Sequence, residues 1–546
     1  MSRRSLLGGM GALAAAATAG SLPAVLAPTT AEAEIGPVLG ANRLAVAVAK
    51  RQELMARMQA VGSTAHPDNG DEARYPNLIG SYSKGMPHNA IGEVRPAAYS
   101  KFVKALNSGL NADFEAIPRG GARPQTSPQS GLSFDPEGND PHQFVQPPAP
   151  AFASAEEAGE IVENYWMALL RDTRFTDYAE SDLAHAAADE LSGLTDFRGP
   201  KEGGVVTPQT LFRDVLPGCT TGPYISQFML LGTPFGTEYV ERRQRTLVKG
   251  SDHMTNFADW LAVQNGNVPT SARFDSVRRY LRNGRDLSEW VHIDVLFQAY
   301  FNACLILGTP PEPGNLPTGG GLGAPLNPGN PYVGSLTQAP FATWGPPFIK
   351  ATLCEVASRG LKAVWWQKWF VHRRLRPEAF AGRVHVHLSG LADYPIHSDV
   401  LNSEVLDRVW SKTGSWLLPM AFPEGSPTHP AYGAGHATVA GASVTILKAF
   451  FDENYVIPNP VVPNGNGTKL VRWEGEPLTV GGELNKIASN VATGRNIAGV
   501  HWRSDALESL RLGEAVAIAL LRDHKSCLHE QGSFTFTKFD GTTITI

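Results

Sequence analysis

Cysteine and charge are both scarce in this chain of 546 residues. The cysteines lie far apart and lack the spacing of a metal site; they are Cys219, Cys304, Cys354 and Cys527. Cys304 and Cys354 stand in apolar, helix-like surroundings, so we expect buried free thiols there rather than disulfides. Only 18% of the residues are charged, and the formal net charge is −5. This balance excludes a global field for nucleic acid or an anionic membrane, so any anion site must be local.

Long hydrophobic runs are absent beyond the N-terminus, which argues against a membrane span. At the N-terminus, Arg3 and Arg4 precede a mildly hydrophobic, Ala/Gly-rich run, and Ala31-Glu32-Ala33 offers a cleavage site. This pattern predicts a twin-arginine-type signal peptide over residues 1–33 and an exported protein, periplasmic or secreted. The alternative is an uncleaved, disordered tail.

Helical periodicity dominates the rest of the chain. The stretch Ser154-Ala155-Glu156-Glu157 is a capping box that predicts the start of one helix, and an apolar stripe predicts another over residues 286–304. His292 and Asp294 lie on that second helix. They are candidate ligands, but polar groups satisfied within a bundle are the more ordinary interpretation.

A Pro/Gly-rich segment, residues 308–347, is the best candidate boundary inside the chain. It separates an N-terminal helical region, 34–307, from a C-terminal region, 348–546. Its glycine run is no phosphate loop, because no strand, lysine or hydroxyl residue follows in the required frame. Alternating residues after Phe534 predict a small C-terminal β-hairpin. We therefore expect an all-α fold with two helical bundles and this one hairpin.

One loop combines the features of an oxyanion site. Residues 427–437 place His429 and His436 seven positions apart among proline and glycine, directly before an apolar segment. At a helix start, the Gly435 amide and the positive end of the helix dipole attract an anion, and His436 adds a group that can transfer a proton. Taken alone, a Gly/Pro loop with two incidental histidines explains this stretch equally well.

A basic element precedes this loop. Lys368, His372 and Arg376 are spaced by four residues, which predicts a shared face on one helix that Pro377 would end. The alternative is a solvated basic face. Aromatic residues within 365–370 argue against full exposure, because they require burial around the helix.

A second basic element follows the loop and again pairs a guanidinium with an imidazole, Arg495 with His501. Asp505 either orients that imidazole or caps the next helix. The two elements and the loop together supply one lysine, two arginines, two or three histidines and a glycine amide. This set is suited to a tetrahedral oxyanion.

The order of these residues resembles the superfamily that unites vanadium-dependent haloperoxidases with type 2 phosphatidic acid phosphatases and bacterial acid phosphatases. Its three blocks correspond here to Lys368…Arg376-Pro377, Ala434-Gly435-His436 and Arg495-x5-His501-x3-Asp505. The seven-residue spacer in the first block and the presence of His429 are similar to the algal and cyanobacterial bromoperoxidases. Residues 82–88 and 222–227 also resemble that group, so the likeness covers roughly residues 70 to 525.

The resemblance implies a vanadate cofactor held by the C-terminal region. Hydrogen peroxide would then oxidise bromide or iodide to a hypohalous acid, which halogenates small organic acceptors. The lack of a haem or flavin motif agrees with this chemistry. The resemblance also implies a homo-oligomer, and no nucleic acid or membrane span is expected.

The same resemblance implies a role for each matching residue. His501 would be the axial vanadium ligand, and the vanadate oxygens would be neutralised by Lys368, Arg376, Arg495 and the Gly435 amide. His436 would be the acid–base group, His429 a further catalytic residue, and Lys368 would also polarise the peroxide. Asp505 and Ala434 would lie directly next to these groups.

The sequence departs from the family pattern at Ala434, where the family has serine, and at Gly433, where proline is usual. A lost hydrogen bond to a charged oxygen is worth roughly 1.5–3 kcal/mol, which would affect vanadate affinity, halide range or rate. Two alternatives stay open. The same residues suit a phosphatase with His501 as nucleophile and His436 as acid, although the spacer and His429 count against it. A catalytically silent, oxyanion-binding helical protein is favoured only by Ala434.

Overall fold

The computed structural model describes residues 41–311 and 321–546. The predicted signal segment, 1–33, and part of the predicted connection, 308–347, lie outside the described residues. Contacts divide the chain into two compact units between Met55 and Ala56, within helix α1 (Ala41–Val61). All elements after α1 belong to the second unit.

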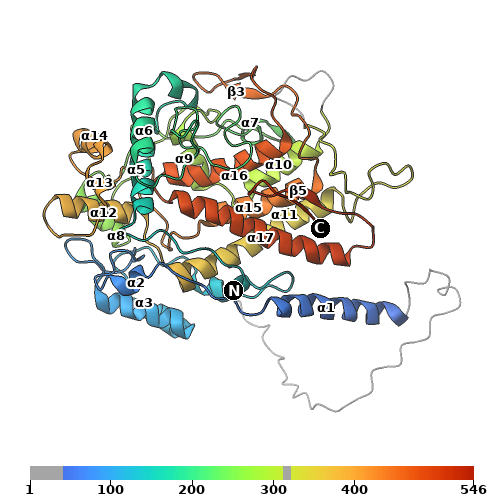
Figure 1. The fold of residues 1–546 in the computed structure, drawn as a ribbon, viewed down its shortest axis with the longest axis horizontal. Coiled ribbons are helices and arrows are strands. Elements are labelled where there is room, and N and C mark those ends of the chain that lie inside the picture. Colours follow the sequence, from blue (N-terminus) through green and yellow to red (C-terminus); the bar gives the residue numbers. More distant parts are fainter. Residues whose placement is uncertain (1–40, 312–320) are drawn as a thin grey trace, which may run out of the picture. The chain divides into compact units, whose positions relative to one another are not determined.

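Helices make up most of the regular structure of the described residues (Figure 1). Before residue 312 they are α2 (Asp71–Arg74), α3 (Pro96–Ser108), α4 (Asn111–Glu115), α5 (Ala155–Leu170), α6 (Asp182–Gly193), α7 (Gln227–Leu230), α8 (Phe257–Gln264), α9 (Gly284–Ile293) and α10 (Gln298–Gly308). After residue 320 they are α11 (Pro346–Trp366), α12 (Pro377–Leu388), α13 (Ser398–Leu401), α14 (Glu404–Thr413), α15 (Gly435–Phe450), α16 (Val480–Ile497) and α17 (Arg503–Cys527).

Strands contribute only short antiparallel pairs among the described residues: β1 (Thr233–Phe235) with β2 (Glu238–Val240), β3 (Val461–Pro463) with β4 (Leu470–Arg472), and β5 (Thr535–Thr537) with β6 (Thr543–Thr545). The predicted all-α class and the predicted C-terminal hairpin are confirmed. One hydrophobic core includes side chains from both sides of residues 308–347. The division of the chain at that segment stays a prediction.

Helix α15 lies at the centre of this core, where it packs against α11, α16 and α17 (Figure 1). All of its residues except His436 are buried. Two glycines allow α15 and α17 to approach closely. A Cβ atom on Gly441 would lie 2.0 Å from the carbonyl oxygen of Leu510, and one on Gly513 would lie 2.0 Å from that of Thr438. This contact fixes the N-terminus of α15 relative to α17, which begins two residues after His501.

The helix predicted over residues 286–304 is wrong, because the chain forms α9 and α10 with a bend of 99° between them. Asn283, not Asp286, caps α9, and its side chain accepts a hydrogen bond from the Asp286 amide. The helix ends because Asp294 turns to an extended conformation, and α10 begins only at Gln298. Ile293 of the predicted stripe is 56% exposed. Because α9 ends at Ile293, Asp294 lies between the two helices and not within one.

Residues 118–150 form a long loop. It contains only short 3-10 turns, η1 (Pro128–Leu132) and η2 (Pro141–Gln143), which pack against α11. The loop reaches the centre of the fold at Gln146, whose side chain donates to the Ser509 hydroxyl on α17 at 3.2 Å. Within the residues that the structure describes, no single helix is long and apolar enough to span a membrane; the bent pair α9 and α10 passes that test only when taken together.

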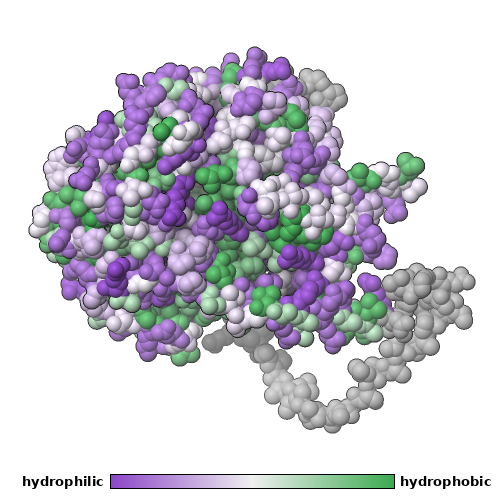
Figure 2. All heavy atoms as spheres, viewed as in Figure 1, coloured by the Kyte–Doolittle hydropathy of each residue, from purple (hydrophilic) through white to green (hydrophobic). Residues whose placement is uncertain are grey.

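Figure 2 shows hydrophilic and hydrophobic residues interspersed over the face in view. The loop between α10 and α11 carries the most exposed large apolar side chain among the described residues, Leu336, at 98%. Phe341, on the same loop, is 71% exposed. These two side chains expose apolar surface that a contact with another protein would cover.

Candidate active site

The chain between α11 and α12 brings two basic side chains into one pocket. Helix α11 passes into a π-helical turn (Gln367–His372), Arg373 is left-handed with φ 41°, and α12 starts at Pro377 with Arg376 as its N-cap residue. The predicted helical face shared by Lys368, His372 and Arg376 is therefore wrong. Pro377 begins a helix instead of ending one, because its fixed φ and missing N–H suit the first helical position.

His372 does not belong to the pocket. It is buried, neither of its ring nitrogens has a hydrogen-bond partner, and its ring meets Tyr432 edge-on at 4.7 Å. Lys368 and Arg376 both face the loop at 429–431. The Lys368 Nζ donates to the carbonyl oxygens of Pro430 at 2.8 Å and Ala431 at 3.0 Å. The guanidinium of Arg376 donates to the carbonyl oxygen of His429 at 2.9 and 3.0 Å.

Arg376 also joins two histidines. Its Nη1 lies 2.9 Å from Nε2 of His501, and its Nη2 lies 2.9 Å from Nδ1 of His429. Because a guanidinium only donates, both of these imidazole nitrogens accept. Burial, followed by the charges of Arg376 and Lys368, holds the pKa of His501 well below its ordinary value. Burial and the same two cations also hold the pKa of His429 well below its ordinary value. Both imidazoles are therefore neutral.

The other ring nitrogen of His501 fixes its tautomer. Nδ1 lies 2.8 Å from Asp505 Oδ2, which is a pure acceptor when ionised, so the ring proton sits on Nδ1 and the lone pair on Nε2. Asp505 also accepts from the Trp502 amide at 3.2 Å. Asp505 therefore orients His501 and also caps α17, so it fulfils both of the roles that the sequence offered as alternatives. An imidazole arranged in this way presents Nε2 as a ligand.

A third cation, Arg495, lies in the last turn of α16 in the same region. It is buried, its Nη1 donates to the Val291 carbonyl at 2.7 Å, and its Nε has no partner. The carbon of its guanidinium lies 5.8 Å from the centre of the Phe422 ring. Its charge contributes to the lowered pKa values of Lys368 and Arg376, so the three cations act on one another.

The N-terminus of α15 completes the pocket. Ala434 is the N-cap residue and makes no side-chain cap, so the first amides of the helix, including that of Gly435, are left without acceptors from the helix itself. His436 is the exposed residue of α15; its side chain is 22% exposed and its Nε2 lies 3.0 Å from Asp294 Oδ1. An imidazole held in this way by a carboxylate can accept and return a proton.

Burial of like charge is the electrostatic signature of this pocket. Burial, followed by the charge of Arg376, lowers the pKa of Lys368 well below its ordinary value. Burial lowers the pKa of Arg376 to about 10 and that of Arg495 to about 10. Among the ion pairs of the described residues, none involves Lys368, Arg376 or Arg495. Three buried cations without a carboxylate partner form a site that an anion would neutralise.

Comparison with known proteins agrees with this arrangement. The family model of the VCPO second helical-bundle domain matches residues 401–530. The vanadium-dependent bromoperoxidase of Corallina pilulifera is 36% identical over 88% of this chain and 92% of that protein, and the one from Corallina officinalis is 34% identical over 96% and 100%. The chain belongs to the vanadium-dependent bromoperoxidases. The homohexameric structure of the second vanadate-dependent bromoperoxidase from Ascophyllum nodosum superposes with a TM-score of 0.88 and 31% identity, covering 96% of this chain and 94% of that one.

The two departures from the bromoperoxidase pattern have a structural context. A Cβ atom on Gly433 would lie 2.3 Å from the Ser509 hydroxyl and 2.6 Å from Gln146 Oε1. Only glycine leaves room for these two side chains at this position. The Ser509 hydroxyl accepts from the Ala434 amide at 2.7 Å. The backbone at residue 434 is therefore held from α17, whereas its side chain supplies no hydrogen bond.

Sequence analysis does not identify most of the carboxylates around this candidate site. Asp294 was interpreted as a bundle residue, yet its partner His436 lies 142 positions further along the chain. Arg374 was given no role. It donates to Asp505 Oδ1 at 2.8 Å and to Glu160 Oε2 at 2.9 Å, and it also pairs with Glu157. The Ser154 cap of α5 is confirmed, but the Glu157 side chain serves this buried network. No local pattern signals such long-range pairs.

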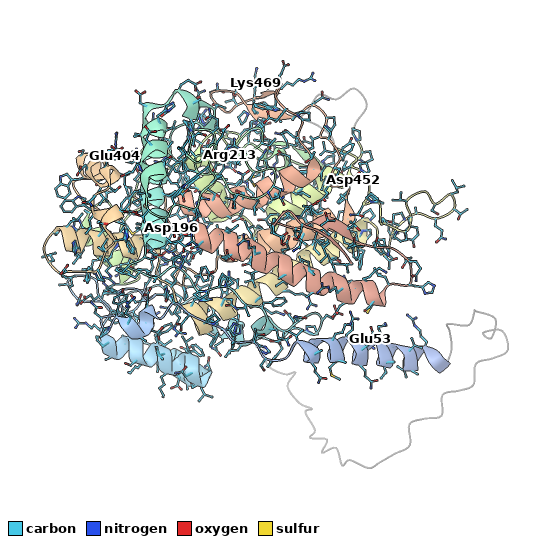
Figure 3. All side chains as sticks on the ribbon, in the orientation of Figure 1. Glu53, Asp196, Arg213, Glu404, Asp452 and Lys469 are labelled. Atoms are coloured by element: carbon cyan, nitrogen blue, oxygen red, sulfur yellow. The ribbon has the colours of Figure 1, made fainter. Side chains whose placement is uncertain are left out.

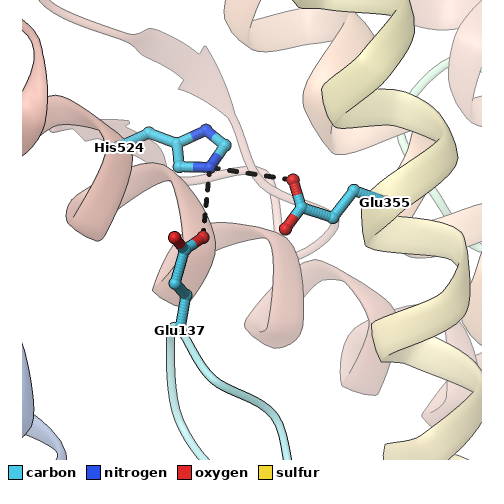
Figure 4. Close-up of side chains that lie close together, drawn as sticks. All are labelled: Glu137, Glu355 and His524. Carbon is cyan, nitrogen blue, oxygen red and sulfur yellow. Dashed lines mark ion pairs between the residues drawn. The ribbon is translucent and has the colours of Figure 1, made fainter.

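Another histidine and two carboxylates meet outside the pocket (Figure 4). The Nε2 of His524 lies 3.8 Å from Glu137 Oε2 and 3.9 Å from Glu355 Oε2. Arg359 already neutralises these carboxylates, since its Nη2 lies 2.7 Å from Glu355 Oε1 and 3.4 Å from Glu137 Oε2. This group is an ion-pair network that ties the loop at 137 to α11 and α17.

Proposed function

We propose that this protein is a vanadium-dependent haloperoxidase that oxidises bromide or iodide with hydrogen peroxide. The product is a hypohalous acid, which halogenates small organic acceptors. The observation that carries the proposal is the set of three buried cations, Lys368, Arg376 and Arg495, without carboxylate partners beside the lone pair of His501 Nε2. When bound there, vanadate supplies a Lewis acid that activates the peroxide.

The residues present fit vanadate. A vanadium centre needs a neutral imidazole ligand, and His501 is neutral with its lone pair on Nε2. The oxygens carry negative charge and need donors. Lys368, Arg376 and Arg495 supply charged donors, and the unpartnered Nε of Arg495 is a donor still free to bind. The Gly435 amide adds the positive end of α15.

Two further histidines act on protons. His436 would accept a proton from peroxide at Nδ1 and return it, because its Nε2 donates to Asp294, which orients the ring. The Nδ1 of His429 lies 2.9 Å from Arg376 Nη2 and 3.2 Å from the Pro430 carbonyl oxygen. Because Nδ1 accepts from the guanidinium in the shorter contact, the ring proton sits on Nε2 and can be donated. The ring of His429 packs against Trp365 at 5.0 Å, which fixes its orientation. Lys368 polarises the peroxide, because its ammonium is buried and bonded only to carbonyl oxygens.

A phosphatase is the second candidate function. The same neutral His501 suits nucleophilic attack on a phosphate ester, with His436 as the acid. The link from Arg376 to both His429 and His501 favours the haloperoxidase, because His429 has no task in the phosphatase scheme. A silent oxyanion-binding protein is the remaining alternative.

Export and assembly are also part of the proposal. The paired arginines and the A-x-A site of residues 1–33 support export to the periplasm or the medium. The exposed apolar loop with Leu336 and Phe341 supports a homo-oligomer, as does the homohexameric bromoperoxidase from Ascophyllum nodosum. Light scattering of the purified protein tests assembly, and a monomeric mass would contradict it.

One assay separates the three functions. Purified protein is loaded with vanadate and given peroxide, bromide or iodide, and a phenol as halogen acceptor; parallel samples receive 4-nitrophenyl phosphate without vanadate. We expect halogenated phenol only when vanadate, peroxide and halide are all present, and little phosphate release. The variant His185→Ala, at an exposed histidine bonded to the Ala179 carbonyl, is a control that should match the parent protein. Phosphate release without halogenation would favour the phosphatase, and neither product would favour the silent protein.

A further inference from the structure

A cavity of about 370 Å³ lies outside the oxyanion pocket and shares no lining residue with it. Its walls come from the chain after α5, the segment before α7, the chain before α9 and the β3–β4 hairpin. Apolar and aromatic side chains form much of the lining, among them Phe175, Tyr224, Leu230, Leu281, Val462 and Trp473. A volume and a lining of this kind are typical of a small-molecule site.

Arg213 gives this cavity a positive charge that no carboxylate cancels directly. Its Nη1 donates to the Cys219 carbonyl at 2.8 Å and its Nη2 to the Gly222 carbonyl at 2.8 Å. The carbon of its guanidinium lies 5.4 Å from the centre of the Tyr224 ring, and that ring stacks on Phe175 at 3.8 Å and 5°. Figure 3 labels Arg213. Burial lowers the pKa of Arg213, so a bound anion would stabilise its charged form.

Two more arginines line the same cavity, and each has its carboxylate partner outside the lining. Arg174 Nε donates to Asp177 at 2.6 Å, and Arg282 Nε donates to Asp286 at 2.8 Å. Among the described residues, the lining holds three arginines and neither aspartate nor glutamate. Glu476 is not a lining residue; its carboxylate accepts from the Gly222 amide at 2.6 Å, and its charge acts on Arg213 from there. The cavity itself therefore presents guanidinium groups and apolar walls.

We propose that this cavity binds a planar aromatic anion, a carboxylate or a sulfonate, with its charged group at Arg213. A guanidinium fork matches the two oxygens of such a group, and stacked aromatic walls match its ring. The lining contains no histidine, cysteine or carboxylate that could act on the ligand, so the site binds and does not catalyse. This function is separate from the haloperoxidase reaction and does not depend on vanadate.

The test is a fluorescence titration of the full protein with 8-anilinonaphthalene-1-sulfonate, which carries an aromatic system and one sulfonate. The neutral analogue N-phenyl-1-naphthylamine is the matched probe without charge. We expect saturable binding of the sulfonate, displacement by 4-hydroxybenzoate, and at least about tenfold weaker binding of the neutral probe, because a charge-assisted hydrogen bond is lost. Equal affinity for the two probes would overturn the proposal.

Variants assign the binding to this cavity. Arg213→Gln should weaken sulfonate binding at least about tenfold, and Arg213→Lys should keep part of it. Trp473→Ala removes a partly exposed ring of the lining, next to β4, that is not part of the hydrophobic core. Arg243→Gln is the control, because Arg243 is an exposed arginine paired with Glu241 outside the cavity. Thermal unfolding verifies that each variant folds. Unchanged binding in both Trp473→Ala and a folded Arg213 variant would refute the assignment.

Discussion

Buried cations lie on both sides of the His501 ring, and the two sides differ in what neutralises the positive charge. Arg376 lies 2.9 Å from Nε2, and the charges of Lys368 and Arg495 also act on the ring; these three cations bind carbonyl oxygens and imidazole nitrogens. Behind Nδ1, Asp505 leads to Arg374, which pairs with carboxylates at each end. Arg374 is as buried as Arg376 and Arg495, yet its electrostatic situation is opposite.

The pKa values show the difference. Burial alone would lower the pKa of Arg374, but the carboxylates of Glu157, Asp505 and Glu160 raise it above the ordinary value. Burial lowers the pKa of Arg376 and Arg495, and no carboxylate bonded to them reverses this. The cation behind His501, Arg374, is neutralised by carboxylates of the fold. The cations in front of it are left for a ligand, which is the difference between a structural network and a binding site.

Removal of His501, which lies between these two sets of charged groups, should have the largest effect on vanadate binding. His501→Ala deletes both the Nε2 lone pair and the partner of Asp505, and a nearby positive charge cannot replace a ligand atom. We expect loss of stoichiometric vanadate, measured as bound vanadium after dialysis. Vanadium retained at one equivalent would contradict the role of His501.

The ion pairs of Arg374 with Glu157, Glu160 and Asp505, here called the rear network, should stabilise the fold. Arg374→Met leaves Glu157, Glu160 and Asp505 buried without their cation, and the loss of one partner of a buried ion pair costs roughly 3–5 kcal/mol. Urea unfolding of the vanadate-free protein measures this loss. A decrease in the free energy of unfolding below about 1 kcal/mol would show that the network is not required for the fold.

Lys368, Arg376 and Arg495, here called the front group, should contribute to vanadate binding and not to the stability of the fold. Lys368→Met and Arg495→Met each remove a buried charge that has no carboxylate partner, so the vanadate-free protein should keep its stability or gain slightly. Vanadate affinity should fall about 10- to 150-fold in each variant, which corresponds to roughly 1.5–3 kcal/mol for a charged hydrogen bond. Calorimetric titration with vanadate and urea unfolding measure the two quantities. Severe destabilisation with unchanged affinity would reverse the assignment.

The turn that joins the two groups contains His372, which gives a pH test. Burial, followed by the charges of His66, Arg373 and Arg374, lowers its pKa from 6.5 to about 3. The unfolded chain therefore binds a proton between pH 6.5 and 3 that the folded chain does not. The stabilising contribution is present above pH 6.5 and is lost as the pH falls towards 3.

His372→Leu should reduce this acid sensitivity. From pH 6.5 to 5.5 the parent protein should lose about 1 kcal/mol more than the variant, measured by urea unfolding at each pH. His185→Ala, at an exposed histidine, is measured alongside as the control for the loss of an imidazole. Parallel slopes for the parent and His372→Leu would exclude His372 as a titrating group.

The sequence reveals the front group better than the rear one, and the reason is chain distance. Lys368 and Arg376, Gly435 and His436, and Arg495 and His501 occur as short local patterns, so their spacing and order can be recognised. Arg374 and Glu157 are 217 residues apart, and no pattern in either stretch points to the other. Such pairs are set by how the helices pack.

Local geometry limited the sequence analysis even where the residues were correct. The spacing of Lys368, His372 and Arg376 fits an α-helix, but the chain forms a π-helical turn and a left-handed residue, which direct His372 away from the other two. The apolar pattern over 286–304 fits one helix, but a bend at Asp294 decides which side chains reach the pocket. Periodicity predicts the type of element, whereas tertiary contacts decide where it breaks.

The smallest expected effect is at Ala434, where the chain departs from its family. Ala434 is the N-cap residue of α15, so Ala434→Ser places a hydroxyl where it can accept from the first amides of the helix. This cap alone should stabilise the vanadate-free protein by about 1 kcal/mol. The same hydroxyl retains its proton, which can be donated to a vanadate oxygen. We therefore expect a gain in stability together with tighter vanadate binding or faster bromide oxidation, measured by urea unfolding, vanadate titration and halide turnover. Ala437→Ser, three residues further on and within α15, is the control that adds a hydroxyl without an N-cap position. A gain in stability without any change in vanadate affinity or turnover would mean that the side chain at 434 caps the helix and does not face the anion.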